Sequence, residues 1–275
     1  MKFLQFLEFL QFLEFLQFPE FKELRELQES MEIQIAVAKV GKYAASESGD
    51  TLEMIERPRG GLSLVLVDGQ RSGRGAKAVS NLVARKAISL LAEGVRDGAA
   101  ARAAHDYLFT QHDGKVQATL NIVSIDLTSK TLVLSRNNPN PIFIARKSAL
   151  TELSETSRPV GLYRHTRPVI AELPLAPETA VVVYTDGLPS AGVRRGKLLD
   201  VRAELERLRG GGLESAQTWA DRLLAAAVAQ DEGRPADDIS VLVVAVLRRK
   251  AADDRERPLG QSLGDARRML VRMPL

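Results

Sequence analysis

Aspartates next to apolar runs are the residues of this 275-residue sequence best placed to do chemistry. They are Asp68, Asp186 and the adjacent pair Asp237 and Asp238, together with Asp50 in a loop after the first predicted strand. A single aspartate at a strand end commonly caps a turn. Several on neighbouring antiparallel strands can instead converge on one edge of a sheet. Glycine follows two of them, as Gly69 and Gly187, and permits tight turns and close backbone approach.

Converging carboxylates repel one another, and they stay ionised together only when something positive is bound. All-oxygen ligands suit hard divalent ions such as Mg or Mn. Two such ions can share and acidify a water that attacks phosphorus directly, so no protein nucleophile is required. The residues alone leave two interpretations open, a two-metal site or a set of independent turn caps.

Composition excludes several other chemistries. The chain has no cysteine, which rules out disulfides, thiolate zinc sites, iron–sulfur clusters and a cysteine nucleophile. This is compatible with a reducing compartment, and we expect a cytoplasmic location. The three histidines, His105, His112 and His165, are too scattered for a zinc motif. We expect His112 and His165 to be surface or packing residues.

The positive charge of the chain belongs to its last residues. The net charge is +3, with 38 Lys and Arg against 35 Asp and Glu. Residues 248–275 carry eight of these basic side chains and four of the acidic ones, which leaves 30 against 31 in the rest. A nucleic-acid-binding body would carry the positive excess itself, so we expect no nucleic-acid partner.

The elements that must position the aspartates alternate between strand-like and helical segments. Val- and Ile-rich runs bounded by Gly, Pro, Asn and Asp predict strands at Glu32–Val40, Leu62–Val67, Ala118–Leu127, Thr131–Ser135, Pro141–Ala145, Pro168–Leu173, Ala180–Tyr184 and Ile239–Leu247. Apolar periodicity predicts helices at Gly75–Val95, Ala99–Phe109 and Glu214–Gln230, the last with Trp219 as its packing anchor. Two successive helices between strand blocks favour an α+β fold, an antiparallel sheet system flanked by helices.

The amino terminus has a different character. Residues 3–18 repeat Phe-Leu-Gln-Phe-Leu-Glu, and seven of the nine phenylalanines lie at or before Phe21. A three-residue repeat matches neither helix nor strand periodicity, so no fixed apolar face is expected. The segment is shorter than the roughly 20 residues of a membrane span and contains Glu8 and Glu14, so we expect no transmembrane span.

Three regions follow from these patterns. Residues 1–30 are expected to be a low-complexity extension and linker; an oligomerising or membrane-surface helix is the alternative. Residues 31–247 form the predicted domain. Residues 248–275 are expected to be a basic, flexible tail, in which a docking segment at Met269–Leu275 is possible but a frayed end is favoured.

Four acidic motifs, taken in order, resemble those of the metal-dependent type 2C protein phosphatases, and most closely their bacterial SpoIIE-like branch. The motifs are Ser48-Gly49-Asp50, Val67-Asp68-Gly69, Tyr184-Thr185-Asp186-Gly187 and Asp237-Asp238-Ile239-Ser240. Segments 137–143 and 158–162 are similar to the Gly-His/Asn-Pro-Pro loop and the Pro-Leu-Gly-Leu segment of that branch. The similarity covers nearly all of residues 31–247, without an attached sensor domain. The chain therefore looks most like the stand-alone RsbX-type phosphatases.

The resemblance implies a fold and an activity. The fold is an αββα sandwich of two antiparallel sheets flanked by helices. The activity is hydrolysis of phosphoserine or phosphothreonine on proteins with two Mn or Mg ions. The substrates implied are STAS-type partner-switching proteins, which control sigma factors or stressosomes in stress signalling.

The resemblance also assigns roles to residues. Asp68 would bridge both ions, and the carbonyl of Gly69 would contact one of them. Asp186 and Asp238 would hold one ion, and Asp50 would help complete the other side. Asp237 is the less certain neighbour of the pair, with a turn or an outer carboxylate as its alternative role.

The metal loop departs from the family pattern at Arg71, where the family usually has glycine. A side chain at this position could distort the loop. Alternatively Arg71 or Arg74 could reach the substrate phosphate, because a guanidinium fork fits two oxygens. The sequence leaves both possibilities open.

Two further functions compete with a phosphatase. Arg71 motivates a catalytically silent phosphoprotein-binding module of the same fold. The acids and the basic tail suggest a two-metal nuclease, but the near-neutral body and the absence of a groove pattern of basic and aromatic residues argue against it.

Overall fold

A computed structural model describes residues 31–248 and 267–274 of the chain. The Phe/Leu repeat, the linker that follows it and residues 249–266 of the tail lie outside the described residues. The strands are β1 Met31–Val40, β2 Asp50–Glu56, β3 Leu62–Gly69, β4 Ala118–Asp126, β5 Thr131–Asn137, β6 Ile142–Arg146, β7 Leu150–Leu153, β8 Val169–Pro174, β9 Thr179–Tyr184, β10 Ile239–Arg248 and β11 Arg267–Pro274. The helices are α3 Arg74–Ala92, α4 Asp97–His112, α5 Gly187–Ser190, the 3-10 turn η1 Val193–Arg195, α6 Val201–Gly210 and α7 Ala216–Gln230.

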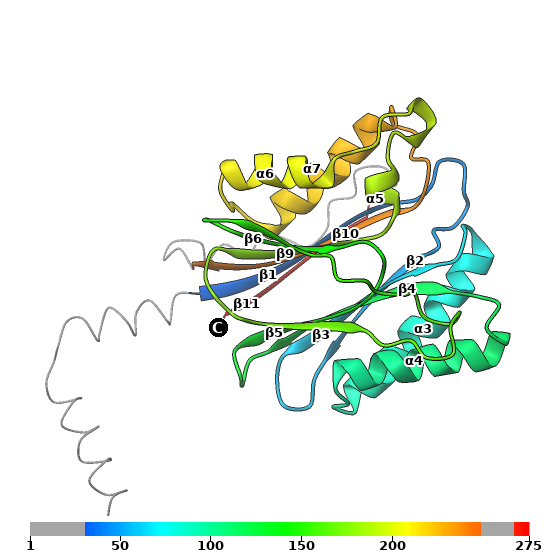
Figure 1. The fold of residues 1–275 in the computed structure, drawn as a ribbon. Helices are drawn as coiled ribbons and strands as arrows, with labels where there is room; N and C mark the ends of the chain where they lie inside the picture. The colour runs from blue at the N-terminus through cyan, green and yellow to red at the C-terminus, as the bar shows by residue number, and fades with distance from the viewer. Residues whose placement is uncertain (1–30, 249–266, 275) are drawn as a thin grey trace, which may run out of the picture.

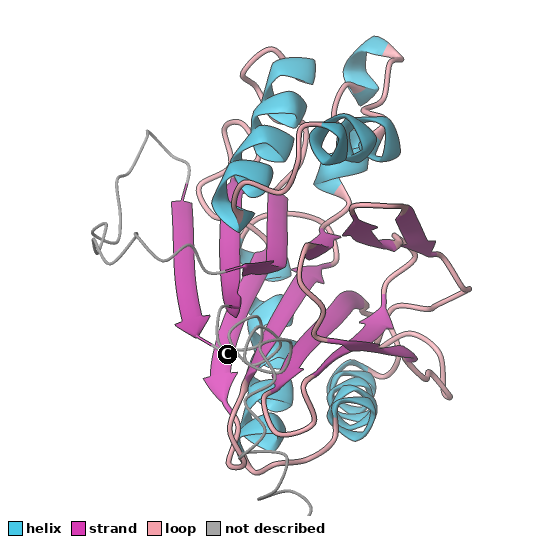
Figure 2. Ribbon diagram, turned by 90° about the vertical axis from the view of Figure 1, so that its left-hand side faces the viewer, coloured by secondary structure: helices cyan, strands magenta, loops and turns pink. Residues whose placement is uncertain are grey.

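Within the described ranges these strands form two antiparallel sheets. Sheet A has the order β11-β1-β10-β9-β6-β7, and sheet B has the order β2-β3-β4-β5-β8. Helices α6 and α7 cover the outer face of sheet A, and α3 and α4 cover that of sheet B (Figure 1). Figure 2 shows the same layers from the side, with helices outside the strands at both ends of the view. The predicted αββα sandwich is therefore confirmed.

The strands of the centre are continuously apolar because both of their faces are buried. In β3, Leu62, Leu64 and Leu66 pack between the sheets, whereas Val65 and Val67 pack against the layer of α3 and α4. A sheet that contacts a second sheet on one side and helices on the other has no face left for water. This is why runs such as that of β3 were recognisable in the sequence.

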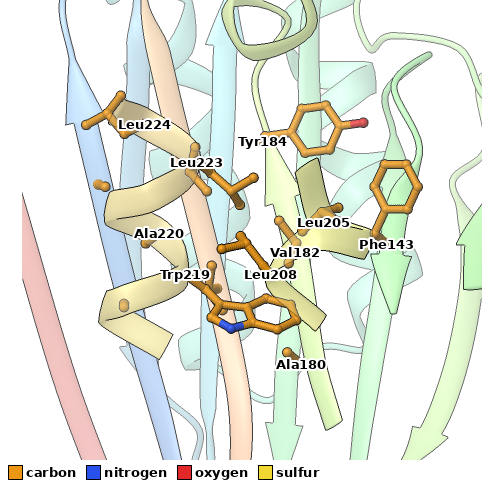
Figure 3. Close-up of a cluster of buried hydrophobic side chains, with 14 of the residues drawn as sticks. Phe143, Ala180, Val182, Tyr184, Leu205, Leu208, Trp219, Ala220, Leu223 and Leu224 are labelled. Carbon is orange, nitrogen blue, oxygen red and sulfur yellow. The ribbon is translucent and has the colours of Figure 1, made fainter. Parts of the chain in front are cut away.

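Helix α7 is anchored at its start and along one face. The side chain of Ser215 caps the helix by accepting a hydrogen bond from the backbone N–H of Thr218. Trp219 is 2% exposed and packs with Leu208 and Leu223 over sheet A (Figure 3). The expected role of Trp219 as the packing anchor of this helix is confirmed.

The structure adds elements that the apolar patterns do not predict. Strand β2 begins at Asp50, which we expected in a loop, and charged residues interrupt its short apolar stretches at the edge of sheet B. Strand β11 pairs with β1 over residues 267–274, so the expectation of a frayed carboxyl end is wrong for these residues. The outer edge of β1 would otherwise present unpaired backbone groups, and strand addition satisfies them.

No helix in the part of the chain that the structure describes is both long enough and apolar enough to cross a membrane.

Candidate active site

The predicted acidic residues lie close together at one end of the two packed sheets. Asp50 opens β2 and lies directly opposite Asp68 at the end of β3. Asp186 follows β9, and the pair Asp237 and Asp238 precedes β10, the antiparallel neighbour of β9. Because the antiparallel pairs run in opposite directions, the start of one strand meets the end of the next. The fold thus brings together residues up to 188 positions apart in the sequence.

Asp50 connects the two sheets through its carboxylate. Its Oδ2 accepts hydrogen bonds from Thr185 Oγ1 at 2.9 Å and from Ser240 Oγ at 2.6 Å, both from sheet A. Its Oδ1 is buried and has no hydrogen-bond partner in the structure. Burial raises the pKa of Asp50 to about 7, although both hydroxyl donors favour its ionised form. One oxygen is therefore fixed by the protein, and the other remains available to a ligand.

Two lysines hold the backbone of the same residue. Lys39 Nζ on β1 donates to the carbonyl oxygen of Asp50 at 2.6 Å, and Lys77 Nζ on α3 donates to the same oxygen at 2.7 Å. Lys77 Nζ also lies 2.9 Å from Thr51 Oγ1. The start of β2 is therefore tied to sheet A and to helix α3.

Asp68 lies at the centre of the acidic cluster. Burial, followed by the charges of Asp50, Asp186 and Asp237, raises the pKa of Asp68 to about 9. A hydrogen bond between the carboxyl groups of Asp68 and Asp186 contributes, with Asp68 as the protonated partner. Asp186 is exposed as a whole residue, yet desolvation of its carboxyl and the charge of Asp237 raise its pKa as well. The three carboxyls are close enough to oppose one another's ionisation.

The adjacent residues Asp237 and Asp238 have different surroundings. Asp238 is buried, and its two carboxylate oxygens accept hydrogen bonds from the backbone N–H groups of Lys42 at 2.9 Å and Gly49 at 2.7 Å. Asp237 is half-buried, and its charge acts on both Asp68 and Asp186. Asp238 also acts on Asp186, but less strongly than Asp237 does. The geometry makes Asp238 the anchor of the β1–β2 loop and turns Asp237 toward the acidic cluster.

The donor set of this cluster fits hard divalent cations. It consists of carboxylate oxygens, and one of them, Asp50 Oδ1, is buried without a partner. Neighbouring carboxyl charges raise the pKa values of Asp68 and Asp186, and a bound cation would reverse this effect. Among the residues that the structure describes, no three acidic or histidine side chains are gathered into a complete metal site as they stand.

Two glycines allow the loops of the site to approach other backbone closely. A β-carbon on Gly69 would lie 2.0 Å from the carbonyl oxygen of Ala76 in the first turn of α3. A β-carbon on Gly187 would lie 2.0 Å from the carbonyl oxygen of Asp238. Side chains at these positions would push the metal loop away from α3 and α5 away from β10. Glycine after Asp68 and Asp186 is therefore required by packing.

Arg71 has a φ of 74°, which lies in the left-handed region of backbone conformation that favours glycine. Its side chain and that of Arg74 are exposed, and the structure does not assign either of them to a substrate phosphate. The loop between β3 and α3 therefore carries backbone strain at Arg71.

Replacing Arg71 by glycine is expected to raise the free energy of unfolding by about 0.5–1 kcal/mol, because the left-handed strain is relieved. Urea unfolding measures this. Lys130→Gly is the matched control, since Lys130 has φ of 54° in the turn between β4 and β5, remote from the acids. A stability gain in Lys130→Gly with none in Arg71→Gly would contradict the interpretation. Arg71→Ala, which keeps the strain, isolates any contact of the guanidinium with substrate.

Thr185 and Ser240 are site residues whose roles the sequence analysis missed, although both lie within the quoted motifs. We expect Thr185→Val to weaken Mn binding about tenfold, because the Asp50 carboxylate loses a donor that orients it. Calorimetric titration with Mn measures the affinity, and Thr185→Ser should restore it. Ser124→Ala is the matched control, since it removes a buried hydroxyl that lies 2.7 Å from Ser63 Oγ within sheet B. Equal Mn affinities in Thr185→Val and the wild type would contradict this role.

Comparison with solved structures places the fold. The phosphatase domain of Bacillus subtilis SpoIIE, solved with a fragment of its regulatory domain, is 20% identical with a TM-score of 0.70, and the match covers 80% of this chain and 65% of that one. RsbX in complex with magnesium is 15% identical with a TM-score of 0.59, over 78% of this chain and 96% of that one. The catalytic domain of the serine/threonine phosphatase PstP with two manganese ions is 18% identical with a TM-score of 0.60, over 79% and 100%.

The two packed sheets and the acidic cluster at their shared end therefore define the type 2C phosphatase fold. The sequence also identifies a family within this class of fold. The family model described as stage II sporulation protein E (SpoIIE) matches residues 58–247, which is more than half of the chain. The chain belongs to the SpoIIE family. A search of curated proteins gives no significant match.

Proposed function

We propose that this protein is a metal-dependent serine/threonine protein phosphatase. The observation that carries the proposal is the cluster of Asp50, Asp68, Asp186 and Asp237, in which Asp50 Oδ1 is buried without a hydrogen-bond partner and neighbouring carboxyl charges raise the pKa of Asp68 and Asp186. Membership of the SpoIIE family and the fold of solved phosphatases support the same activity. A bound divalent cation would offset the repulsion among these carboxylates.

Each acidic residue has a part in the proposed site. Asp68 would contact two ions, with the Gly69 carbonyl beside one of them, and Asp186 and Asp237 would hold one ion. Asp50 would present Oδ1 on the other side. We assign Asp237 in place of Asp238, because both oxygens of Asp238 already accept backbone hydrogen bonds. Bound Mn or Mg would supply the Lewis acidity that activates water and offsets phosphoryl charge.

The proposed substrates are phosphorylated STAS-type partner-switching proteins of the cytoplasm, within a stress-signalling or stressosome module. The motif resemblance and the similarity to RsbX and to the RsbU domain of a Mycobacterium tuberculosis protein support this assignment. The full chain would be incubated with a STAS-domain protein phosphorylated on serine or threonine, with Mn, Mg or chelator. We expect phosphate release that requires metal. Release unaffected by chelator would refute the metal dependence.

A catalytically silent phosphoprotein-binding module is the second candidate, favoured by the strained backbone of Arg71 in the metal loop. It differs from the enzyme in one measurable outcome. A silent module would bind the phosphorylated STAS protein more tightly than the unphosphorylated one and release no phosphate with any metal. Multiple turnovers with Mn would eliminate it.

A further inference from the structure

A basic pocket of about 570 Å³ adjoins the acidic cluster. Its walls are the end of β1, the β1–β2 loop, the first turn of α3 and the loop before β10. It adjoins the cluster at Asp50, because Lys39 and Lys77 of its lining both donate hydrogen bonds to the carbonyl oxygen of that residue. A substrate bound at the acidic cluster would therefore lie next to this pocket.

The charged side chains that line the pocket are mostly positive. They are Lys39, Lys42 and Lys77, with Glu47 as the single acid. The carbonyl oxygen of Asp50, which carries no net charge, accepts hydrogen bonds from the ammonium groups of Lys39 and Lys77, and the charge of Lys39 also acts on the Asp50 carboxyl. Among the described residues, neither Lys42 nor Lys77 forms an ion pair with a carboxylate. The lining therefore favours an anion.

The rim of the pocket adds a second basic group. Tyr43 is 53% exposed, and the guanidinium of Arg234 lies 5.4 Å from the centre of its ring. The backbone of the two segments is joined by a hydrogen bond of 2.9 Å from Tyr43 N to Pro235 O. This packing holds an exposed guanidinium beside Tyr43, which lines the pocket.

We propose that this pocket is a specificity subsite that receives an acidic side chain two or three residues from the phosphorylated serine or threonine of the substrate. The inference rests on the proposed phosphatase function and names the substrates that the site prefers. An extended peptide advances about 3.3 Å per residue, so such a side chain lies about 7–10 Å along the chain from the phosphorylated residue. Lys42 and Arg234 are the specificity-determining residues.

Two phosphothreonine peptides test the inference. They are identical except for Glu or Gln at the second and third positions on both sides of the phosphothreonine. We expect the full-length protein to bind the Glu peptide about tenfold more tightly in chelator, the effect of two or three partly exposed ion pairs. With Mn, kcat/KM should favour the Glu peptide to a similar degree, mainly through KM. Both differences should shrink as salt rises from about 0.05 M to about 0.5 M.

A charge reversal makes the test specific to the pocket. In Lys42→Glu/Arg234→Glu, the preference should shift to a third peptide with Lys at the same positions. Lys147→Glu is the matched control and should keep the wild-type preference. Lys147 follows β6, whose last residue Arg146 pairs with Thr179 at the end of β9 remote from Asp186. If the double variant does not fold, Arg234→Gln at the exposed rim should still lower the Glu preference about threefold.

The outcomes separate this inference from the proposed function. Equal binding of the Glu and Gln peptides by the wild-type protein would overturn the subsite, whether or not phosphate is released. A Glu preference that survives the double charge reversal would also overturn it. A Glu preference in binding with no Mn-dependent release from either peptide would support the subsite and refute the phosphatase.

Discussion

Asp68→Asn is expected to lower kcat/KM for a phosphoprotein substrate by at least about 10²–10³-fold, the scale on which one electrostatic stabiliser of a reaction matters. Asp68 is the carboxyl on which Asp50, Asp186 and Asp237 all act, so no other residue is as central to the cluster. An amide keeps the shape of the side chain but removes the charge that a cation requires. Steady-state hydrolysis with Mn measures the loss, and activity within tenfold of the wild type would contradict this role.

The same variant is expected to be more stable than the wild type without metal. Asp50 and Asp68 have folded-state pKa values of about 7 and about 9, both above their ordinary value. Raised carboxyl pKa values mean that the folded state favours the protonated form. Their contribution to stability is therefore present at acidic pH and is lost as pH rises through 7 and 9.

Thermal unfolding in chelator checks this sign. The melting temperature of the wild type should fall between about pH 5 and pH 9, and Asp68→Asn should fall less because its central group does not ionise. Added Mn should raise the wild-type melting temperature more at pH 8 than at pH 6, since protons compete with the cation. A metal-free protein that becomes more stable toward pH 9 would contradict the cluster's mutual repulsion. We therefore expect Asp68→Asn to be inactive but more stable than the wild type, because the charges that activity requires lower the stability of the metal-free protein.

The sequence predicts the parts of this fold in which local pattern and burial agree. Strands β3 and β10 are continuously apolar because both of their faces are covered, so composition alone identifies them. Strand β2 was missed because it lies at an edge, where charged residues such as Glu53 and Glu56 face solvent. Strands β1 and β11 lie at opposite ends of the sequence, and no local pattern specifies that they pair.

The site shows the same division between local and long-range information. Motifs locate the aspartates, since Asp68 and Asp186 follow apolar runs, Asp237 and Asp238 precede one, and Asp50 ends a Ser-Gly-Asp loop motif. They do not reveal that Thr185 and Ser240 of sheet A fix the carboxylate of Asp50 in sheet B. Nor do they reveal that Lys77 of α3 holds the carbonyl of the same residue. These contacts depend on the packing of one sheet on the other, which the sequence does not display.

Asp237 and Asp238 give the second large expected effect, because adjacent residues at a strand start project to opposite sides. Asp237→Asn is expected to weaken Mn binding and to lower kcat/KM by at least about 10²-fold, with little change in the free energy of unfolding in chelator. Asp238→Asn is expected to lower that free energy by about 1–3 kcal/mol, because a buried carboxylate that accepts the N–H groups of Lys42 and Gly49 becomes an amide.

Mn titration and urea unfolding of both variants separate the two roles. The decisive quantity is the ratio of lost metal affinity to lost stability, which should be large for Asp237→Asn and small for Asp238→Asn. The reverse ratios would return the metal-ligand role to Asp238. Asp238 can still reduce activity through the β1–β2 loop, because Gly49 immediately precedes Asp50 and its N–H is bound by Asp238 at 2.7 Å. In that case Mn at saturating concentration should restore most of the kcat of Asp238→Asn and little of that of Asp237→Asn, since of the two residues only Asp237 is proposed to hold a cation.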